Sequence, residues 1–113
     1  MKIQRTDIFI KWFEKLKNKQ VAIAIVARIR MIEDRDYLGK TYPIANGISE
    51  IKFEMGAGYR LYFNIYTDGN EVWFLTGGDK STQNRDIETA KLLLEELQKE
   101  RKKDNGKDYD YER

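Results

Sequence analysis

Hydrophobic residues recur at helical spacing in the first third of the chain. The first set lies three or four positions apart, at Ile8, Phe9, Trp12, Phe13 and Leu16. Thr6 or Asp7 can cap the start of this helix, and residues 2–5 precede it as a short strand. A polar break over residues 17–20 is short enough to join two antiparallel helices. We therefore predict a second helix over residues 20–37, with the apolar stripe Ala22, Ile25, Val26, Ile29 and Ile32.

The middle of the chain alternates between apolar and polar residues, which is typical of strands. Residues 49–55 place Ile51, Phe53 and Met55 on one face and Glu50, Lys52 and Glu54 on the other. Residues 59–66 set Tyr59, Leu61, Phe63 and Ile65 against Arg60, Tyr62, Asn64 and Tyr66. Glycine-rich residues 56–58 form the turn between these strands, and Asp68-Gly69 predicts the next hairpin. Residues 71–76 are apolar on both faces, which predicts a central strand.

The last third reads as one helix and a tail. Gly77 and Gly78 end the third long strand, and Ser81 or Asn84 can cap a helix over residues 85–100. The stripe of this helix is Ile87, Ala90, Leu93, Leu94 and Leu97. Residues 101–113 have almost nothing to bury, so we predict a disordered charged tail after a single domain of residues 1–100.

The helices are segregated from the strands, which indicates an α+β fold. We expect an N-terminal helical hairpin packed on a small twisted antiparallel sheet, with a closing C-terminal helix. Residues 38–43 are a connection, in which Pro43 pushes Tyr42 towards extended backbone.

The composition narrows the chemistry. The 113 residues contain no histidine and no cysteine, so catalysis must use lysine, arginine, tyrosine, hydroxyls or carboxylates. No apolar run approaches 18 residues and no secretory signal is present, so we expect a cytoplasmic protein without membrane contact. Walker, GxGxxG and EF-hand motifs are absent and the carboxylate pairs are isolated, so we expect no metal and no cofactor.

Positive charge is concentrated at the start of the chain. Residues 1–30 hold eight basic and two acidic residues, a net +6, whereas the whole chain is +2. A basic end, including Lys15 and Lys19, suits contact with phosphates. The alternative is an ordinary solvated helix surface.

Cations also gather on the polar face of the predicted sheet. Lys52 and Arg60 lie on hairpin-paired strands with the same facing, and Tyr62 shares that face. Lys80 follows the third long strand and can fold back over the same face. This cluster predicts an anion-binding site. The alternative is a solvated sheet face with cross-strand Glu–Lys and Glu–Arg pairs.

The same stretches resemble a known family. The runs GAGYRLYF at residues 56–63 and GGDKSTQ at residues 77–83 look like the RelE/ParE superfamily of type II toxin–antitoxin toxins. EIKF from residue 50 and DIETA from residue 86 add to the likeness, which covers about residues 4–97. Within the superfamily the chain is most similar to the HigB-like addiction module killer branch.

The resemblance implies an endoribonuclease that cuts mRNA in the ribosomal A site without a metal, using the 2′-OH of the RNA as nucleophile. By position, Arg60 matches the arginine that clamps the transition state, Lys80 a second cation, and Lys52 a base or phosphate ligand. Gln83 and Arg85 are expected to contact RNA. The resemblance also implies a cognate antitoxin, often a small helix-turn-helix protein.

One position departs from RelE itself. Near Asp86, where RelE has a functional tyrosine, this chain has none. Tyr62 can replace it, Gln83 and Arg85 can serve differently, or the chemistry is not that of RelE. ParE-like toxins inhibit DNA gyrase without cutting RNA, and a non-toxic partner-binding module is the third alternative. The oligomeric state is left open.

Overall fold

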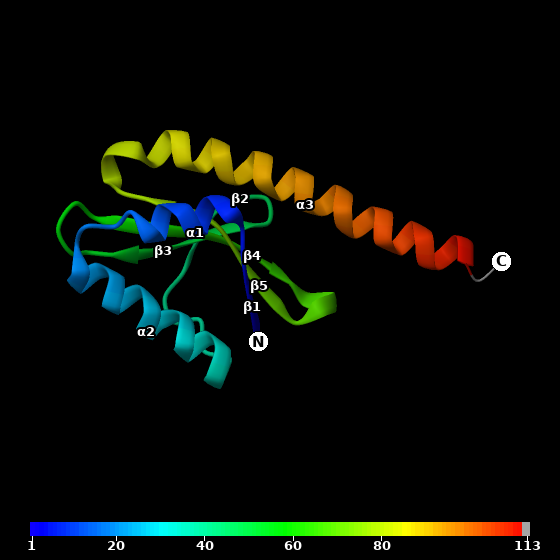
Figure 1. Ribbon diagram of the computed structural model, residues 1–113, viewed down its shortest axis with the longest axis horizontal. Helices are drawn as coiled ribbons and strands as arrows, with labels where there is room; N and C mark the ends of the chain where they lie inside the picture. Colours follow the sequence, from blue (N-terminus) through cyan, green and yellow to red (C-terminus); the bar gives the residue numbers. More distant parts are fainter. Residues whose placement is uncertain (112–113) are drawn as a thin grey trace.

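The computed structural model describes the backbone of residues 1–111 and the side chains of residues 1–103. In chain order the elements are β1 (Lys2–Arg5), α1 (Asp7–Glu14), α2 (Lys19–Arg35), β2 (Tyr42–Ala45), β3 (Ile48–Phe53), β4 (Tyr59–Tyr66), the 3₁₀ turn η1 (Thr67–Gly69), β5 (Glu71–Gly78), the 3₁₀ turn η2 (Lys80–Thr82) and α3 (Gln83–Tyr111). Figure 1 shows α3 running along the sheet and projecting beyond it. The α+β class predicted from the pattern is confirmed.

The strands form one sheet in the order β1-β5-β4-β3-β2. Strands β2 to β5 pair antiparallel, whereas β1 lies parallel to β5. The sheet is therefore mixed, and the prediction of a purely antiparallel sheet is wrong at this edge. No hairpin turn joins β1 to β5, because most of the chain intervenes, so nothing forces the antiparallel direction. The interior position predicted for β5 is confirmed.

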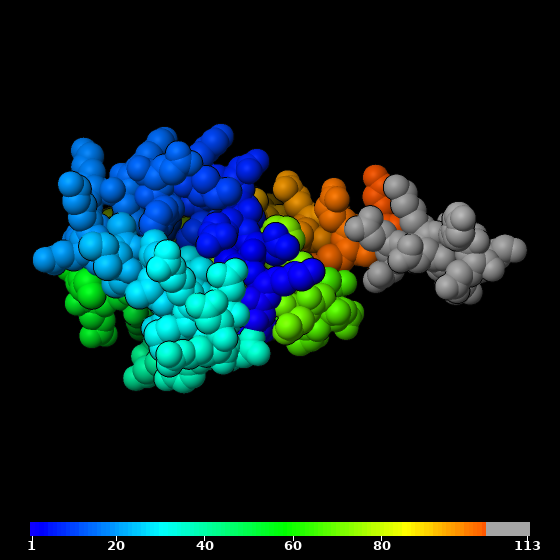
Figure 2. Space-filling view, turned by 60° about the horizontal axis from the view of Figure 1, so that its bottom comes forward, coloured from blue at the N-terminus to red at the C-terminus, as the bar shows by residue number. Residues whose placement is uncertain are grey.

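Helices α1 and α2 cover one face of the sheet. Their apolar side chains pack against those of the strands in a core formed by Phe9, Val21, Ile25, Ile29, Ile32, Ile51, Phe53, Leu61, Phe63, Val72 and Phe74. Figure 2 shows α1 and α2 side by side on this face of the molecule. The stripe of α2 is rotated slightly from the prediction, because Val21 is buried and Val26 is 38% exposed.

Helix α3 covers the other face. Its Ala90 and Leu94 pack on Ile48, Tyr62 and Leu75 of the strands. The sequence predicted a polar, open face here, and this is wrong because the apolar stripe of α3 needs a partner and finds it on this side. A register shift between β4 and β5 leaves Leu75 as an extra residue, so that it also points into this second core.

Several boundaries differ from the predictions. Thr6 caps α1 as predicted, and its hydroxyl accepts a hydrogen bond from the Phe9 amide. Asn18 caps α2, which therefore begins at Lys19. Strand β2 begins at Tyr42, so its first two residues lie in the segment 38–43 that was predicted as a connection. Helix α3 is entered directly from η2, so neither Ser81 nor Asn84 serves as its cap.

Helix α3 continues to Tyr111, beyond Glu100, after which the charged tail was predicted to begin. Arg101 explains part of this extension. Its Nη1 donates to Asn64 Oδ1 at 2.9 Å, and its guanidinium lies 4.0 Å from the centre of the Tyr66 ring. The last two residues of the predicted tail, 112–113, lie outside the described residues. Within the described part of the chain, no helix combines the length and apolar character that crossing a membrane requires.

Candidate functional site

Lys52 and Arg60, predicted to share one face of paired strands, lie directly opposite each other on β3 and β4. Both face the carboxylate of Glu50, which precedes Lys52 by two residues on the same face of β3. Lys52 Nζ is 3.7 Å from Glu50 Oε1, and Arg60 Nε is 3.7 Å from Glu50 Oε2. The Glu50 side chain is only 2% exposed and that of Arg60 is 12% exposed, so this charge cluster reaches the surface only at its edge.

The turn between β3 and β4 holds the guanidinium of Arg60 from a second side. Arg60 Nη1 donates a hydrogen bond of 2.9 Å to the carbonyl oxygen of Gly58. Gly58 has a φ of +74°, a left-handed conformation that favours glycine. Among the described groups, none accepts a hydrogen bond from Arg60 Nη2. One edge of the guanidinium is therefore available to a ligand.

Lys80 lies beside the same turn. Its backbone N–H donates to the carbonyl of Ala57 at 3.3 Å. Its Cβ would lie 3.6 Å from a Cβ built on Gly58. The structure thus brings Lys80 to the edge of the Lys52–Arg60 pair, which is the neighbourhood predicted for it.

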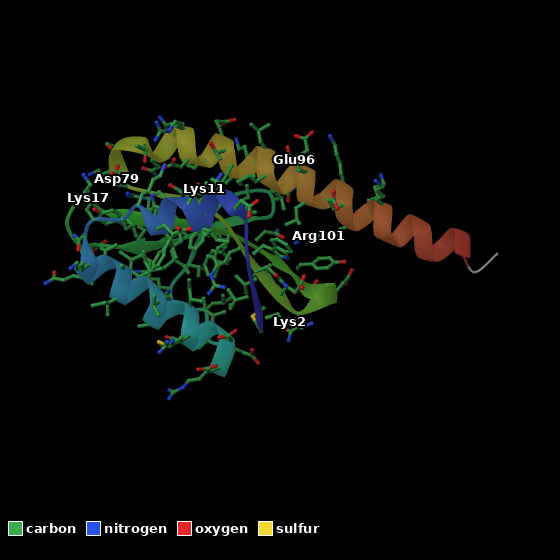
Figure 3. The ribbon with its side chains drawn as sticks, in the orientation of Figure 1. Lys2, Lys11, Lys17, Asp79, Glu96 and Arg101 are labelled. Atoms are coloured by element: carbon green, nitrogen blue, oxygen red, sulfur yellow. The ribbon has the colours of Figure 1, made fainter. Side chains whose placement is uncertain are left out.

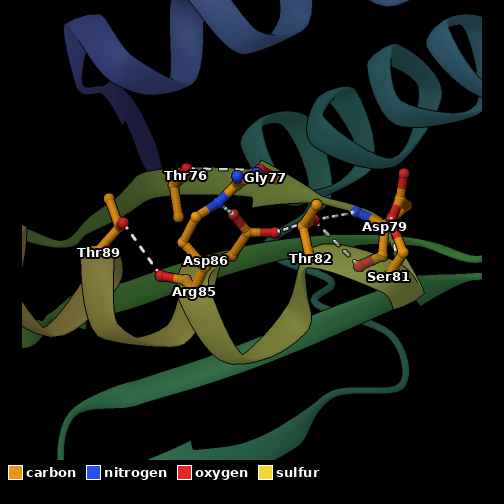
Figure 4. A network of polar contacts seen from close by, with 8 residues as sticks. All are labelled: Thr76, Gly77, Asp79, Ser81, Thr82, Arg85, Asp86 and Thr89. Atoms are coloured by element: carbon orange, nitrogen blue, oxygen red, sulfur yellow. Dashed lines mark hydrogen bonds and ion pairs between the residues drawn. The ribbon is translucent and has the colours of Figure 1, made fainter.

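A network of hydrogen bonds fixes the segment that carries Lys80 (Figure 4). The Asp79 carboxylate accepts from the Ser81 amide at 2.8 Å, and the Asp79 amide donates to Thr82 Oγ1 at 3.2 Å. Thr82 Oγ1 in turn donates to Asp86 Oδ2. The Ser81 hydroxyl lowers the pKa of Asp79, whereas burial raises the pKa of Asp86 against the opposing effect of the Thr82 hydrogen bond.

Close packing on both faces of the sheet explains the two glycines at the end of β5. A Cβ on Gly77 would lie 2.4 Å from the Trp12 ring. A Cβ on Gly78, the cross-strand partner of Arg60, would lie 1.7 Å from Asp86 Oδ2. The strand was predicted to stop at Thr76, before the glycines, but it includes both of them and ends at Gly78.

Tyr62 does not lie on an open surface. Its side chain is 0% exposed beneath α3, and its hydroxyl has no hydrogen-bond partner among the described groups. Burial raises the pKa of Tyr62 to about 12, and the carboxylates of Glu50 and Asp86 add to this effect. Tyr62 is therefore a neutral phenol that no ligand can reach while α3 is in place.

The remaining predicted contact residues lie at the same end of the molecule. Gln83 and Arg85 belong to the first turn of α3. Together with the other residues of the segment 80–85 they line a surface hollow. The Arg85 side chain is 77% exposed. Lys15 and Lys19 are exposed at the α1–α2 connection. In Figure 3 Lys17 of this connection and Asp79 both lie at the left-hand end of the molecule, and a Cβ on Gly56 would lie 3.0 Å from Asn18 Nδ2. The α1–α2 connection and the segment that carries Lys80 thus both lie beside the β3–β4 turn.

Several residues of this arrangement were not identified from the sequence. Glu50 was assigned only to a polar sheet face, and Asp79, Thr82 and Asp86 lack any periodic signal. Their role depends on contacts between elements that a sequence pattern does not reveal. Within the described residues, no three or more aspartate or glutamate side chains are grouped so as to hold a metal ion.

The fold has known relatives among solved structures. A double arginine-to-alanine mutant of the Escherichia coli toxin RelE in the free state is similar, with a TM-score of 0.59 and 16% identity over 80% of this chain and 94% of that one. The isolated E. coli RelE toxin is also similar, with a TM-score of 0.55 and 14% identity over 77% of this chain and 95% of that one. At these identities the likeness shows the fold.

Comparison by sequence gives a nearer relative. No family model matches the chain. An uncharacterised protein of Haemophilus influenzae strain Rd is 40% identical over 97 residues, which are 86% of this chain and 96% of the relative. The chain has the fold of the RelE toxin and belongs to the same family as this H. influenzae protein.

Proposed function

We propose that the protein is the toxin of a type II toxin–antitoxin pair, of the HigB-like branch, and that it cuts mRNA on the ribosome without a metal. The observation that carries this proposal is the convergence of Lys52, Arg60 and Lys80 at one end of a RelE-like sheet. The cations come from two paired strands and the loop beside their turn. Such a cluster suits a phosphodiester that gains negative charge during reaction.

The reaction has three requirements. The RNA 2′-OH must lose its proton as its oxygen bonds to the adjacent phosphorus, the phosphorane must be stabilised, and the 5′-oxygen must gain a proton as its bond to phosphorus breaks. The free Nη2 edge of Arg60 suits the phosphorane oxygens. Lys52 and Lys80, which lie near this edge, can bind the phosphate and transfer the protons.

Tyr62 does not fit a direct part in this chemistry. The tyrosine that RelE itself uses has no counterpart near Asp86, and Tyr62 is buried beneath α3. The three cations must therefore carry the reaction without a phenol. Lys15 and Lys19 at the α1–α2 connection, with Gln83 and Arg85, are placed to contact ribosomal RNA or mRNA.

The test is induced expression of Arg60→Ala and Lys80→Ala variants, with primer extension on mRNA from programmed ribosomes. Both variants should lose growth arrest and cleavage while their far-UV circular dichroism is unchanged. Lys91→Ala, which removes an exposed lysine paired with Glu88 on α3, is the matched control and should stay active. Full toxicity of both site variants would show that the site is wrong.

A second assay separates the targets. Purified protein is added to a DNA gyrase supercoiling reaction beside the ribosome assay. Inhibition of gyrase without mRNA cleavage would replace the ribonuclease proposal with a ParE-like one. Harmless expression without any antitoxin would favour a non-toxic binding module.

A further inference from the structure

A buried carboxylate lies beneath the two strand cations of the site. Glu50 is 2% exposed, and burial of a charged group is unfavourable unless partners compensate for the lost hydration. Its partners are both 3.7 Å away, which is beyond hydrogen-bonding distance, and Oε2 makes no hydrogen bond with any described group. An apolar residue at such a position is often as stable as the ion pair. Stability is therefore a weak reason for a glutamate here.

The contacts of Glu50 give a better reason. Its two oxygens are divided between the two cations, Oε1 towards Lys52 and Oε2 towards Arg60. Each cation also has a second support. Lys52 Nζ lies 4.5 Å from the centre of the Tyr42 ring, and Arg60 Nη1 is bound to the Gly58 carbonyl. Glu50 is the support that both cations share.

These supports leave a defined part of each cation for a ligand. Arg60 Nε lies 3.7 Å from Glu50 without a hydrogen bond, and Nη1 is bound to the Gly58 carbonyl, so Nη2 is the donor that contacts neither of these groups. The guanidinium plane is thereby fixed by two contacts. A planar donor held in this way loses less entropy when it binds a phosphate.

From this geometry we infer that Glu50 is a positioning residue, which orients Arg60 and Lys52 towards the scissile phosphate without touching the RNA. The inference rests on the proposed ribonuclease function. A positioning role and simple electrostatics predict opposite effects on cleavage when Glu50 loses its charge. Removing a negative charge from beneath the cations should strengthen their attraction for phosphate, whereas losing their orientation should slow the reaction.

The experiment compares Glu50→Gln with wild type and with Glu54→Gln, a control that makes the same charge change at an exposed residue of the neighbouring turn. Cleavage of mRNA is measured on programmed ribosomes at varied ribosome concentration. For Glu50→Gln we expect kcat to fall about 10- to 100-fold while KM is unchanged or lower. Glu54→Gln should match wild type.

A second readout does not depend on RNA. In NMR spectra of the free protein, the Arg60 Nε–H should exchange with water more slowly than that of Arg85, whose side chain is 77% exposed. Glu50→Gln should remove this difference. If circular dichroism shows that Glu50→Gln does not fold, Glu50→Asp replaces it. Aspartate keeps the negative charge but its shorter side chain holds the carboxylate farther from both cations, so kcat should again fall with KM unchanged.

The outcomes are distinguishable. Cleavage by Glu50→Gln at the wild-type rate or faster, with Arg60→Ala inactive, would overturn the positioning role and leave the proposed function intact. If the wild-type protein does not cleave mRNA, the proposed function fails and the NMR measurement decides alone. Arg60 Nε–H exchange as fast as that of Arg85, or unchanged in Glu50→Gln, would then overturn the inference.

Discussion

The two faces of the sheet bury side chains of different kinds. The face beneath α1 and α2 holds an apolar core, in which Phe9, Phe63 and Phe74 pack ring against ring. The face beneath α3 buries Glu50, Asn64, Thr76 and Asp86 beside its apolar residues. Buried polar groups cost stability where they lack partners, and on the α3 face Glu50 Oε2 and the Tyr62 hydroxyl have no hydrogen-bond partner among the described groups. We expect substitutions on the two faces to separate stability from activity.

Phe74→Ala should produce the largest effect, on stability. Phe74 is 0% exposed and contacts the rings of Phe9 and Phe63, with centroids 5.4 and 6.1 Å away. Removing the ring leaves a cavity, which costs about 3–5 kcal/mol of unfolding free energy. Urea denaturation followed by circular dichroism measures this loss. Phe74→Leu is the control and should lose clearly less, and equal losses in both variants would show that the cavity is not the cause.

Gly78→Ala tests the packing of the α3 face against the site. Its Cβ would overlap the Asp86 carboxylate, so the first turn of α3 and η2 must shift, at a cost of about 1–3 kcal/mol. Because η2 carries Lys80, mRNA cleavage should fall as well.

The double variant Gly78→Ala/Asp86→Ala supplies the control. Removing the carboxylate relieves the overlap, so the double variant should lose less stability than the sum of the two single variants. Additive losses, measured by urea denaturation, would mean that Asp86 does not explain the glycine.

The sequence predicted the strands and the cation pair but not what covers them. Alternation in residues 49–55 and 59–66 predicted that Lys52 and Arg60 share one face of paired strands, and the structure adds the register that sets them directly opposite each other. The same alternation grouped Tyr62 with Arg60. It could not show that α3 covers Tyr62 completely and leaves the edge of Arg60 exposed. Burial of a face depends on which helix packs there, and this is a tertiary property.

Two further omissions have local causes. Strand β2 is four residues long and contains Pro43, so its pattern is too short and too interrupted to read as a strand. The network of Asp79, Thr82 and Asp86 joins a strand end to a helix through side-chain oxygens, with no repeat in the sequence. The cations of the site were therefore easier to predict than the hydrogen bonds that hold the surrounding segments in place.

Tyr62→Phe separates burial from function on the α3 face. The hydroxyl has no described partner, so its removal should leave stability at pH 7 unchanged or raise it by about 1 kcal/mol. Cleavage of mRNA should be unchanged, because the phenol does not reach the RNA. A large loss of kcat would return Tyr62 to the catalytic machinery and would imply that α3 moves.

The same variant makes a prediction about pH. The pKa of Tyr62 is raised to about 12, so between about pH 10 and 12 the unfolded protein loses the proton while the folded protein retains it. The unfolded state then binds fewer protons, and the stability of the folded state falls as pH rises. Wild type should therefore lose up to about 3 kcal/mol more than Tyr62→Phe over this range. Parallel pH curves in urea denaturation would contradict the burial of the phenol.

The smallest effect is expected at the surface, where charges act without packing. Lys15→Gln/Lys19→Gln changes two exposed lysines at the α1–α2 connection, so stability should shift by no more than about 0.5 kcal/mol. If these lysines contact ribosomal RNA, each releases about one counterion on binding, and the slope of log affinity against log salt should fall by up to about two. Lys99→Gln/Lys91→Gln on α3 is the control, because both lysines have carboxylate partners on their own helix. An unchanged salt slope in the first variant, with mRNA cleavage intact, would mean that the basic connection is an ordinary solvated surface and that recognition of RNA is confined to the end of the sheet.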